Sequence, residues 1–155
     1  MIGSTGMNPM TSWNPTPEGS SELQELLREH LGLAMELLEL SRREEKEMSG
    51  DRAELLRETS SARNVLLPRL KESLDKLRKH RIDWQNLTST QRKHPPEVAA
   101  LLRQTQDCIM RVLLLDRQNE KELLRLGFDP GLGARGECGP KAHYVADLYR
   151  RQNKS

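Results

Sequence analysis

The longest amphipathic pattern in the chain covers residues 97–127. Apolar residues recur there every three or four positions, which is the period of an α-helix. The preceding segment 94–96, HPP, suits a helix start, because the backbone donor that proline lacks would be unpaired in a first turn anyway. Gly127 can end the helix in a left-handed conformation at low cost. We therefore expect a helix over 97–126 whose stripe needs partner helices. The stripe consists of Val98, Leu101, Leu102, Cys108, Ile109, Val112, Leu115, Leu123 and Leu126.

An earlier pattern predicts a helix over 21–48. Ser20 or Ser21 can cap its start, since a serine hydroxyl accepts from a free backbone N–H of the first turn. His30 occupies one position of a leucine seam along this helix. The segment 41–47, SRREEKE, is wholly polar, so we expect the helix to project beyond the core there. The seam leucines are Leu23, Leu26, Leu33, Leu37 and Leu40.

Between these two patterns, a third predicts a helix over 52–87, entered through a tight turn at 49–51. A tight connection between helices predicts antiparallel neighbours. Pro68 lies inside the pattern, and we expect it to kink the helix, with two separate helices as the alternative. Segment 88–96 is then the second connection. The stripe consists of Leu55, Leu56, Thr59, Leu66, Leu70, Leu74, Leu77, Trp84 and Leu87.

These three helices predict an all-α protein, an elongated antiparallel three-helix bundle or coiled coil over residues 21–127. The first helix is acidic and the second is basic, which favours their pairing. Residues 1–20 are rich in Gly, Ser, Thr, Asn and Pro, and we expect a disordered N-terminal segment. Residues 128–155 are expected to be a flexible Gly-rich tail with a short helix at 143–151.

Composition narrows the classes of partner. The 155 residues are 35% hydrophobic and 31% charged, which is typical of long helices with one apolar stripe. A net charge of +2 and 3% aromatic residues argue against a nucleic-acid partner. No apolar run reaches the roughly 18 residues of a membrane span, and no secretory signal pattern begins the chain. Cys108 and Cys138 are expected to be free thiols in a reducing compartment, with a disulfide between tail and helix as the alternative.

The chain carries no motif for catalysis, a cofactor or a metal. Its four histidines are scattered, and neither HxxxH nor CxxC occurs. Cys138 and His143 have a plausible zinc spacing but lack a second pair of ligands. The basic run at 76–81 is interrupted by acids nearby, so we favour a solvated face over an anionic partner. The residues alone therefore indicate no catalytic, cofactor or metal site. The histidines are His30, His80, His94 and His143.

Two apolar patches are the candidates for partner binding. Residues 112–115 are apolar around a whole turn, which predicts either a helix packed between two others or an apolar groove left open for a partner's helix. The tail patch at 144–149 has helical spacing, and our hypothesis is that it covers or completes this groove. The predicted partner-binding residues are Leu113, Leu114, Leu115, Leu123, Tyr144, Val145, Leu148 and Tyr149.

Three segments together resemble the FlgN family of flagellar export chaperones: LLELSRREEKEM, GDRAELLRETSSARNVLL and LDRQNEKELLRLG. The similarity covers residues 22–127, and LDRQNEKELL is its most telling piece. The resemblance implies a bacterial cytoplasmic chaperone that binds the C-terminal helices of hook-filament junction proteins before type III secretion and then visits the flagellar export gate. It thus implies binding without a reaction, so that the protein is not an enzyme. One alternative is a generic coiled-coil adaptor that forms a homodimer and has no flagellar client, and another is a small enzyme or metal protein.

Overall fold

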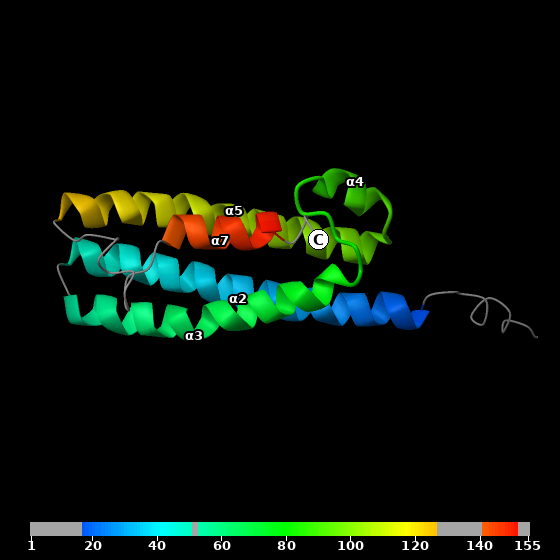
Figure 1. Cartoon of the computed structure of the whole chain (residues 1–155), viewed down its shortest axis with the longest axis horizontal. Coiled ribbons are helices and arrows are strands. Elements are labelled where there is room, and N and C mark those ends of the chain that lie inside the picture. The colour runs from blue at the N-terminus through cyan, green and yellow to red at the C-terminus, as the bar shows by residue number, and fades with distance from the viewer. Residues whose placement is uncertain (1–16, 51–52, 127–140, 152–155) are drawn as a thin grey trace, which may run out of the picture.

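The structure, a computed structural model, describes residues 17–50, 53–126 and 141–151. All regular secondary structure in these ranges is helical, so the predicted all-α class is confirmed. The predictions for residues 1–16, 51–52, 127–140 and 152–155, which include Gly127 and Cys138, lie outside the described residues. The helices are α2 (Pro17–Ser49), α3 (Ala53–Arg78), α4 (Leu87–Arg92), α5 (Pro96–Arg125) and α7 (Lys141–Arg151) (Figure 1).

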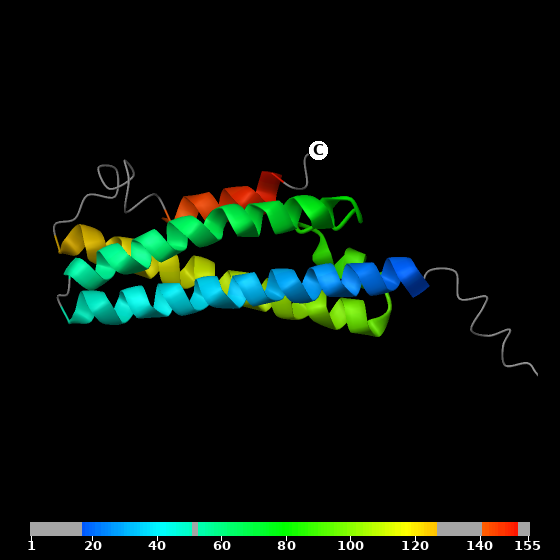
Figure 2. The same cartoon turned by 90° about the horizontal axis from the view of Figure 1, so that it is seen from below.

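The long helices α2, α3 and α5 lie side by side and give the molecule an elongated shape (Figure 1). Helix α3 runs opposite to α2, whereas α5 runs in the same direction as α2 and packs along it. Helix α7 packs on α5, on the side of the bundle between α5 and α3 and across from α2 (Figure 2). The predicted three-helix arrangement did not include α7 as a fourth packed helix.

The apolar core falls into three clusters along the bundle. The central cluster joins the middle of α2, α3 and α5 to α7. A second cluster lies where α4 covers the start of α5, and it includes Leu27, Leu77 and Val98. A small third cluster lies near the turn between α2 and α3. It consists of Met48, Leu56 and Leu123.

Helix α3 ends at Arg78, so the predicted helix over 52–87 is too long at its C-terminal end. Its last carbonyls accept backbone bonds in a tight turn, from His80 to Leu77 at 2.9 Å and from Arg81 to Arg78 at 3.0 Å. Arg81 has a φ of 57°, a left-handed conformation that turns the chain out of the helix. The apolar pattern continues beyond this point because residues of the turn and of α4 also face the core. Ile82 and Leu87 are both buried.

The structure also differs from expectation at the start of α2, and it decides between the two alternatives at Pro68 of α3. Helix α2 begins at Pro17, so residues 17–20 belong to it and Ser20 and Ser21 lie within it rather than capping it. Helix α3 continues through Pro68 as one helix, and the alternative of two helices is wrong. Helix α5 starts at Pro96, in the first-turn position that suits proline.

The polar segment 41–47 does not project beyond the core. Ser41, Glu44 and Glu47 are buried along α2, and Met48 beyond them is buried as well. Periodicity alone missed this because the three side chains have a helical spacing but are polar. Their burial requires polar partners on α3 and α5.

Candidate functional site

Helix α7 covers a surface formed by α5 and α3 with His30 of α2 at its base, and we call this surface the α7 site. The face of α7 that lies against it contains most of the predicted tail residues. Val145 and Leu148 are 0% and 1% exposed, and Tyr149 is 8% exposed. These positions follow the spacing i, i+3 and i+4, which places them on one face of a helix. Asp147 and Arg150 form an ion pair on the outer side of α7. The sequence of α7 is therefore that of an amphipathic helix with one buried face.

A polar anchor lies at the base of the α7 site. Nε2 of His30 on α2 lies 2.5 Å from the hydroxyl oxygen of Tyr149, and its Nδ1 lies 3.0 Å from Oγ of Ser73 on α3. Burial lowers the pKa of His30 from 6.5 to about 3, so the ring is neutral. A neutral imidazole has one donor and one acceptor nitrogen, so one hydroxyl donates to the ring and the other accepts from it. His30 thus joins three helices through two hydrogen bonds.

Trp84 covers this anchor from the segment between α3 and α4. Its ring centroid lies 5.2 Å from that of Tyr149 in an edge-to-face contact, and 5.9 Å from that of His30. Burial, followed by the nearby Cys108, raises the pKa of Tyr149, so its hydroxyl keeps its proton. Three aromatic rings from α2, α7 and the connecting segment therefore form one contact cluster.

His30, Ser73 and Trp84 were not among the predicted partner-binding residues. The available signal was a histidine in a leucine seam, because a polar side chain in an apolar stripe needs buried partners. Trp84 was assigned to the stripe of the second helix, but it lies beyond the end of α3. Its contacts arise from the turn after Arg78, which the apolar period does not indicate.

The predicted partner-binding residues of α5 do not form one open surface. Leu113 and Leu115 are partly buried and pack against the central cluster, whereas Leu114 is 55% exposed. Leu123 is 3% exposed and packs with Met48 and Leu56, so its assignment to an open groove is wrong. Tyr144 is partly buried against the central cluster. In the apolar turn at 112–115, Val112 is therefore buried, Leu113 and Leu115 are partly buried, and Leu114 is exposed.

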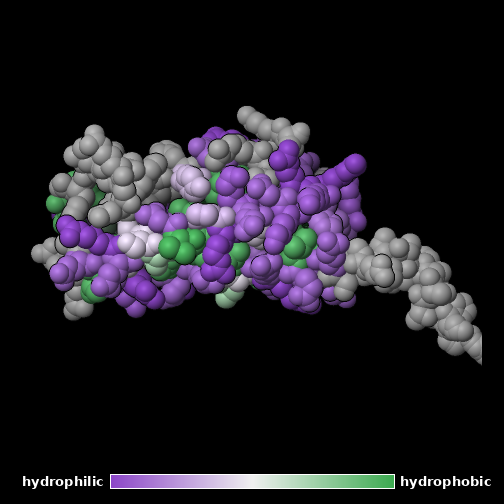
Figure 3. All heavy atoms as spheres, turned by 60° about the horizontal axis from the view of Figure 1, so that its bottom comes forward, coloured by the Kyte–Doolittle hydropathy of each residue, from purple (hydrophilic) through white to green (hydrophobic). Residues whose placement is uncertain are grey.

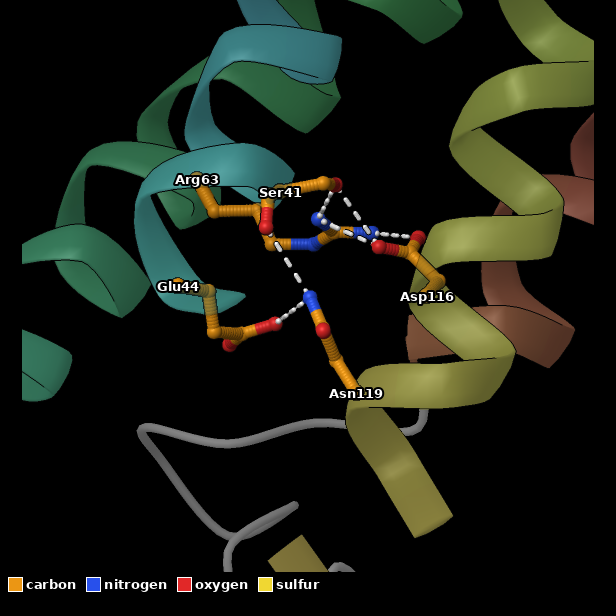
Figure 4. Close-up of polar contacts among 5 residues, drawn as sticks. All are labelled: Ser41, Glu44, Arg63, Asp116 and Asn119. Atoms are coloured by element: carbon orange, nitrogen blue, oxygen red, sulfur yellow. Dashed lines mark hydrogen bonds and ion pairs between the residues drawn. The ribbon is translucent and has the colours of Figure 1, made fainter. Parts of the chain in front are cut away.

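A buried polar layer separates the central apolar cluster from the cluster near the turn (Figure 4). Arg63 of α3 forms an ion pair with Asp116 of α5, and both side chains are almost fully buried. Ser41 of α2 donates to Asp116 at 2.7 Å and accepts from Arg63 at 3.1 Å. Asn119 donates to the Ser41 carbonyl at 2.9 Å and to Oε1 of Glu44 at 3.1 Å.

This layer explains why part of the LDRQN segment is polar. Asp116 and Asn119 face the interior and connect α5 to α2 and α3, whereas Arg117 between them is exposed. One turn after Glu44, Glu47 of α2 accepts a hydrogen bond from the hydroxyl of Thr59 on α3 at 2.7 Å. Nε of Arg63 is the one buried side-chain polar atom without a hydrogen-bond partner in the part of the chain that is described. Polar residues of all three long helices therefore depend on one another's positions, which ties the helices to a single register.

The described residues offer little for metal or nucleophile chemistry. Among them, no three side chains of His, Cys, Asp or Glu gather in a way that could hold a metal ion. Cys108 is a buried free thiol, and burial raises its pKa despite the opposing charges of Arg111 and Arg42. A raised pKa disfavours the reactive thiolate. Within the ranges described, no helix is long and apolar enough to span a bilayer.

Comparisons with family models, with curated proteins and with solved structures find no match to this chain.

Proposed function

We propose that this chain is an export chaperone of the FlgN kind, which binds amphipathic helices of a client and catalyses no reaction. The clients are the C-terminal helices of hook-filament junction proteins, held in the bacterial cytoplasm before flagellar type III secretion. The flagellar export gate is the second partner. Client and gate come from the resemblance of residues 22–127 to that family, and the mode of binding comes from the bundle.

The single observation that carries the proposal is the packing of α7. This amphipathic helix of 11 residues seats its apolar face against long helices of the bundle. A surface that accepts one such helix has the shape and the apolar character to accept another, since helix-in-groove recognition uses side chains at i, i+3 and i+4. A client helix would bind at the α7 site in place of α7. Alternatively, it would bind beside α7, where Leu113 lines a small pocket together with Ala146 and Tyr149.

Tethering makes α7 a competitor at high effective concentration. Deletion of residues 128–155 should therefore raise client affinity if α7 occupies the client's site, and lower it if α7 forms part of the site. Calorimetric titration of the full chain and the truncated chain with a C-terminal peptide from a hook-filament junction protein distinguishes the two. Equal affinities would show that α7 takes no part in client binding. Absence of binding by either chain would refute the proposed chaperone function.

A coiled-coil adaptor that forms a homodimer is the second candidate, and a surface away from α7 favours it. Val65 on α3 is 68% exposed, beside a shallow pocket with Leu40 and Leu66 at its floor. Figure 3 shows a small apolar area on the face formed by α2 and α3, surrounded by hydrophilic residues. Arg69 lines the pocket from α3, and α2 lines it with two acids and one base, so both signs of charge surround the apolar floor. The α2 residues are Glu36, Glu39 and Arg43. Sedimentation equilibrium with the Val65→Lys variant tests this: a dimer that dissociates on substitution supports the adaptor.

A further inference from the structure

We propose that His30 makes the α7 site selective for a helix with a tyrosine at one fixed position, in the pattern aliphatic-x-x-aliphatic-Tyr. This inference rests on the proposed function, because it names the feature of the client helix that the site reads. In α7 the pattern is Val145, Leu148 and Tyr149, with Ala146 and Asp147 at the two unspecified positions.

The selectivity arises from burial of the imidazole. His30 is 0% exposed; its Nδ1 lies 3.0 Å from Oγ of Ser73 within the bundle, and its Nε2 lies 2.5 Å from the hydroxyl of Tyr149, the present occupant of the α7 site. An occupant with phenylalanine at the position of Tyr149 would cover Nε2 without supplying a partner. A buried polar atom left without its partner costs its full desolvation free energy. A site built around such a bond discriminates strongly against an analogue that lacks the hydroxyl.

Geometry restricts the hydroxyl to tyrosine. The hydroxyl of Tyr149 reaches Nε2 of His30 at 2.5 Å because it lies at the far end of a ring that passes through the apolar face of α7. Serine and threonine carry their hydroxyls on Cβ, a ring's length short of this nitrogen. Trp84 meets the ring of Tyr149 edge to face, with an interplanar angle of 89°. The contact with Trp84 favours an aromatic ring, and the contact with His30 favours a hydroxyl at its far end.

Ser73 is a positioning residue in this arrangement. It holds Nδ1 of His30 at 3.0 Å and thereby fixes the plane of the imidazole, so that Nε2 points at the occupant. Without Ser73 the ring can reorient, and the difference between tyrosine and phenylalanine should shrink. Affinity for the phenylalanine form should change little, because that form makes no bond to the ring.

The test uses the full chain with α7 released by the replacements Val145→Asp and Leu148→Asp. Labelled peptides of sequence KAHYVADLYRR and its Tyr149→Phe form are titrated by fluorescence anisotropy. The matched control is the Tyr144→Phe peptide, which removes the same hydroxyl from a partly buried position. Circular dichroism checks that the host keeps its helix content, and Leu148→Ala alone is the milder host if the double replacement reduces it.

We expect the Tyr149→Phe peptide to bind about 5- to 100-fold more weakly than the parent, from the cost of an unpaired buried group. The Tyr144→Phe peptide should stay within about twofold of the parent, because it keeps the aromatic ring and leaves the bond between His30 and Tyr149 intact. In a host that also carries His30→Leu, the preference for tyrosine at 149 should vanish or reverse. In a Ser73→Ala host it should decrease.

Equal weakening by the two peptide substitutions would overturn the inference, and so would an undiminished tyrosine preference in the His30→Leu host. Failure of the parent peptide to bind a helical host would also overturn it, because the site would then accept no helix in trans. The proposed function is decided separately by the titration with a hook-filament junction peptide. Binding of that client with no dependence on His30 would leave the chaperone function standing and the selectivity refuted.

Discussion

The hydroxyl of Ser41 donates a 2.7 Å hydrogen bond to Asp116, which lies 75 positions further along the chain. This bond joins α2 to α5 inside a layer that also includes the guanidinium of Arg63. Removal of one partner from a buried ion pair leaves an uncompensated charge in the interior. The layer therefore makes the bundle sensitive to single substitutions there, and less sensitive to replacement of the whole pair.

Asp116→Ala should lower the free energy of unfolding by about 3 to 5 kcal/mol, because it strands the buried charge of Arg63. The double replacement Arg63→Met with Asp116→Leu should recover part of this loss, because it leaves no buried charge, although the Ser41 hydroxyl loses both of its partners. Urea unfolding followed by circular dichroism measures both. Arg117→Ala is the matched control, and as an exposed neighbour it should stay within about 0.5 kcal/mol. If the double replacement were as unstable as the single one, the ion pair would not be the cause.

Much of the fold follows from the apolar period. The leucine stripes predicted three long helices, and stripe positions such as Leu37, Leu70 and Leu102 are fully buried. The period failed where other interactions decide. Helix α3 ends because Arg81 adopts a left-handed conformation, yet the apolar pattern continues into the turn and α4. Such a pattern indicates which residues face the core, but it does not indicate whether the backbone between them is helical.

The candidate site was predicted only in part. The amphipathic tail patch identified Val145, Leu148 and Tyr149, whose spacing is visible in one short segment. The polar anchor was missed because His30 and Tyr149 are 119 positions apart, and nothing local pairs them. The burial of segment 41–47 was missed for a related reason. A run of polar residues indicates solvent exposure unless its partners on the other helices are known.

Leu70 and Leu77 test the packing of α3 in two different apolar clusters. Both side chains are 0% exposed, Leu70 in the central cluster and Leu77 in the one near α4. Truncation of either to Ala should cost about 2 to 5 kcal/mol through lost burial and the cavity left behind. Lys79→Ala, at an exposed position, should stay within about 0.5 kcal/mol. Thermal and urea unfolding measure all three, and comparable losses at the leucines and at Lys79 would mean that α3 is packed in another register.

Stability should depend on pH through His30. Burial lowers its pKa from 6.5 to about 3, so between these values the unfolded chain binds a proton that the folded chain does not. Stability is therefore present above pH 6.5 and is lost as the pH falls, by about 1.4 kcal/mol per unit or about 2 kcal/mol from pH 7 to pH 5.

The comparison of the native chain with His30→Leu isolates this effect. Urea unfolding at pH 7, 6 and 5 should show a smaller loss of stability in the variant. The pKa of His94 is also lowered, by its own burial and then by His80 and Lys93, but His94 is present in both proteins and its contribution cancels. Parallel pH dependences of the two proteins would show that His30 is not buried in solution.

Helix α7 should open more readily than the rest of the bundle. It has 11 residues and packs chiefly on α5, whereas α2 has 33 residues and packs along both α3 and α5. Segments with fewer buried contacts open at lower free energy and exchange their amide hydrogens sooner. Hydrogen exchange followed by mass spectrometry should therefore show α7 exchanging before the middle of α2.

Val145→Asp should abolish protection in α7, because it places a charge at a position that is 0% exposed. The same substitution should leave the protection of α2 around Leu27 largely unchanged, since that residue belongs to the cluster at the α4 end. Simultaneous loss of protection in α7 and throughout α2 would mean that α7 is an integral part of the cooperative bundle, and another helix could then replace it only by unfolding the bundle.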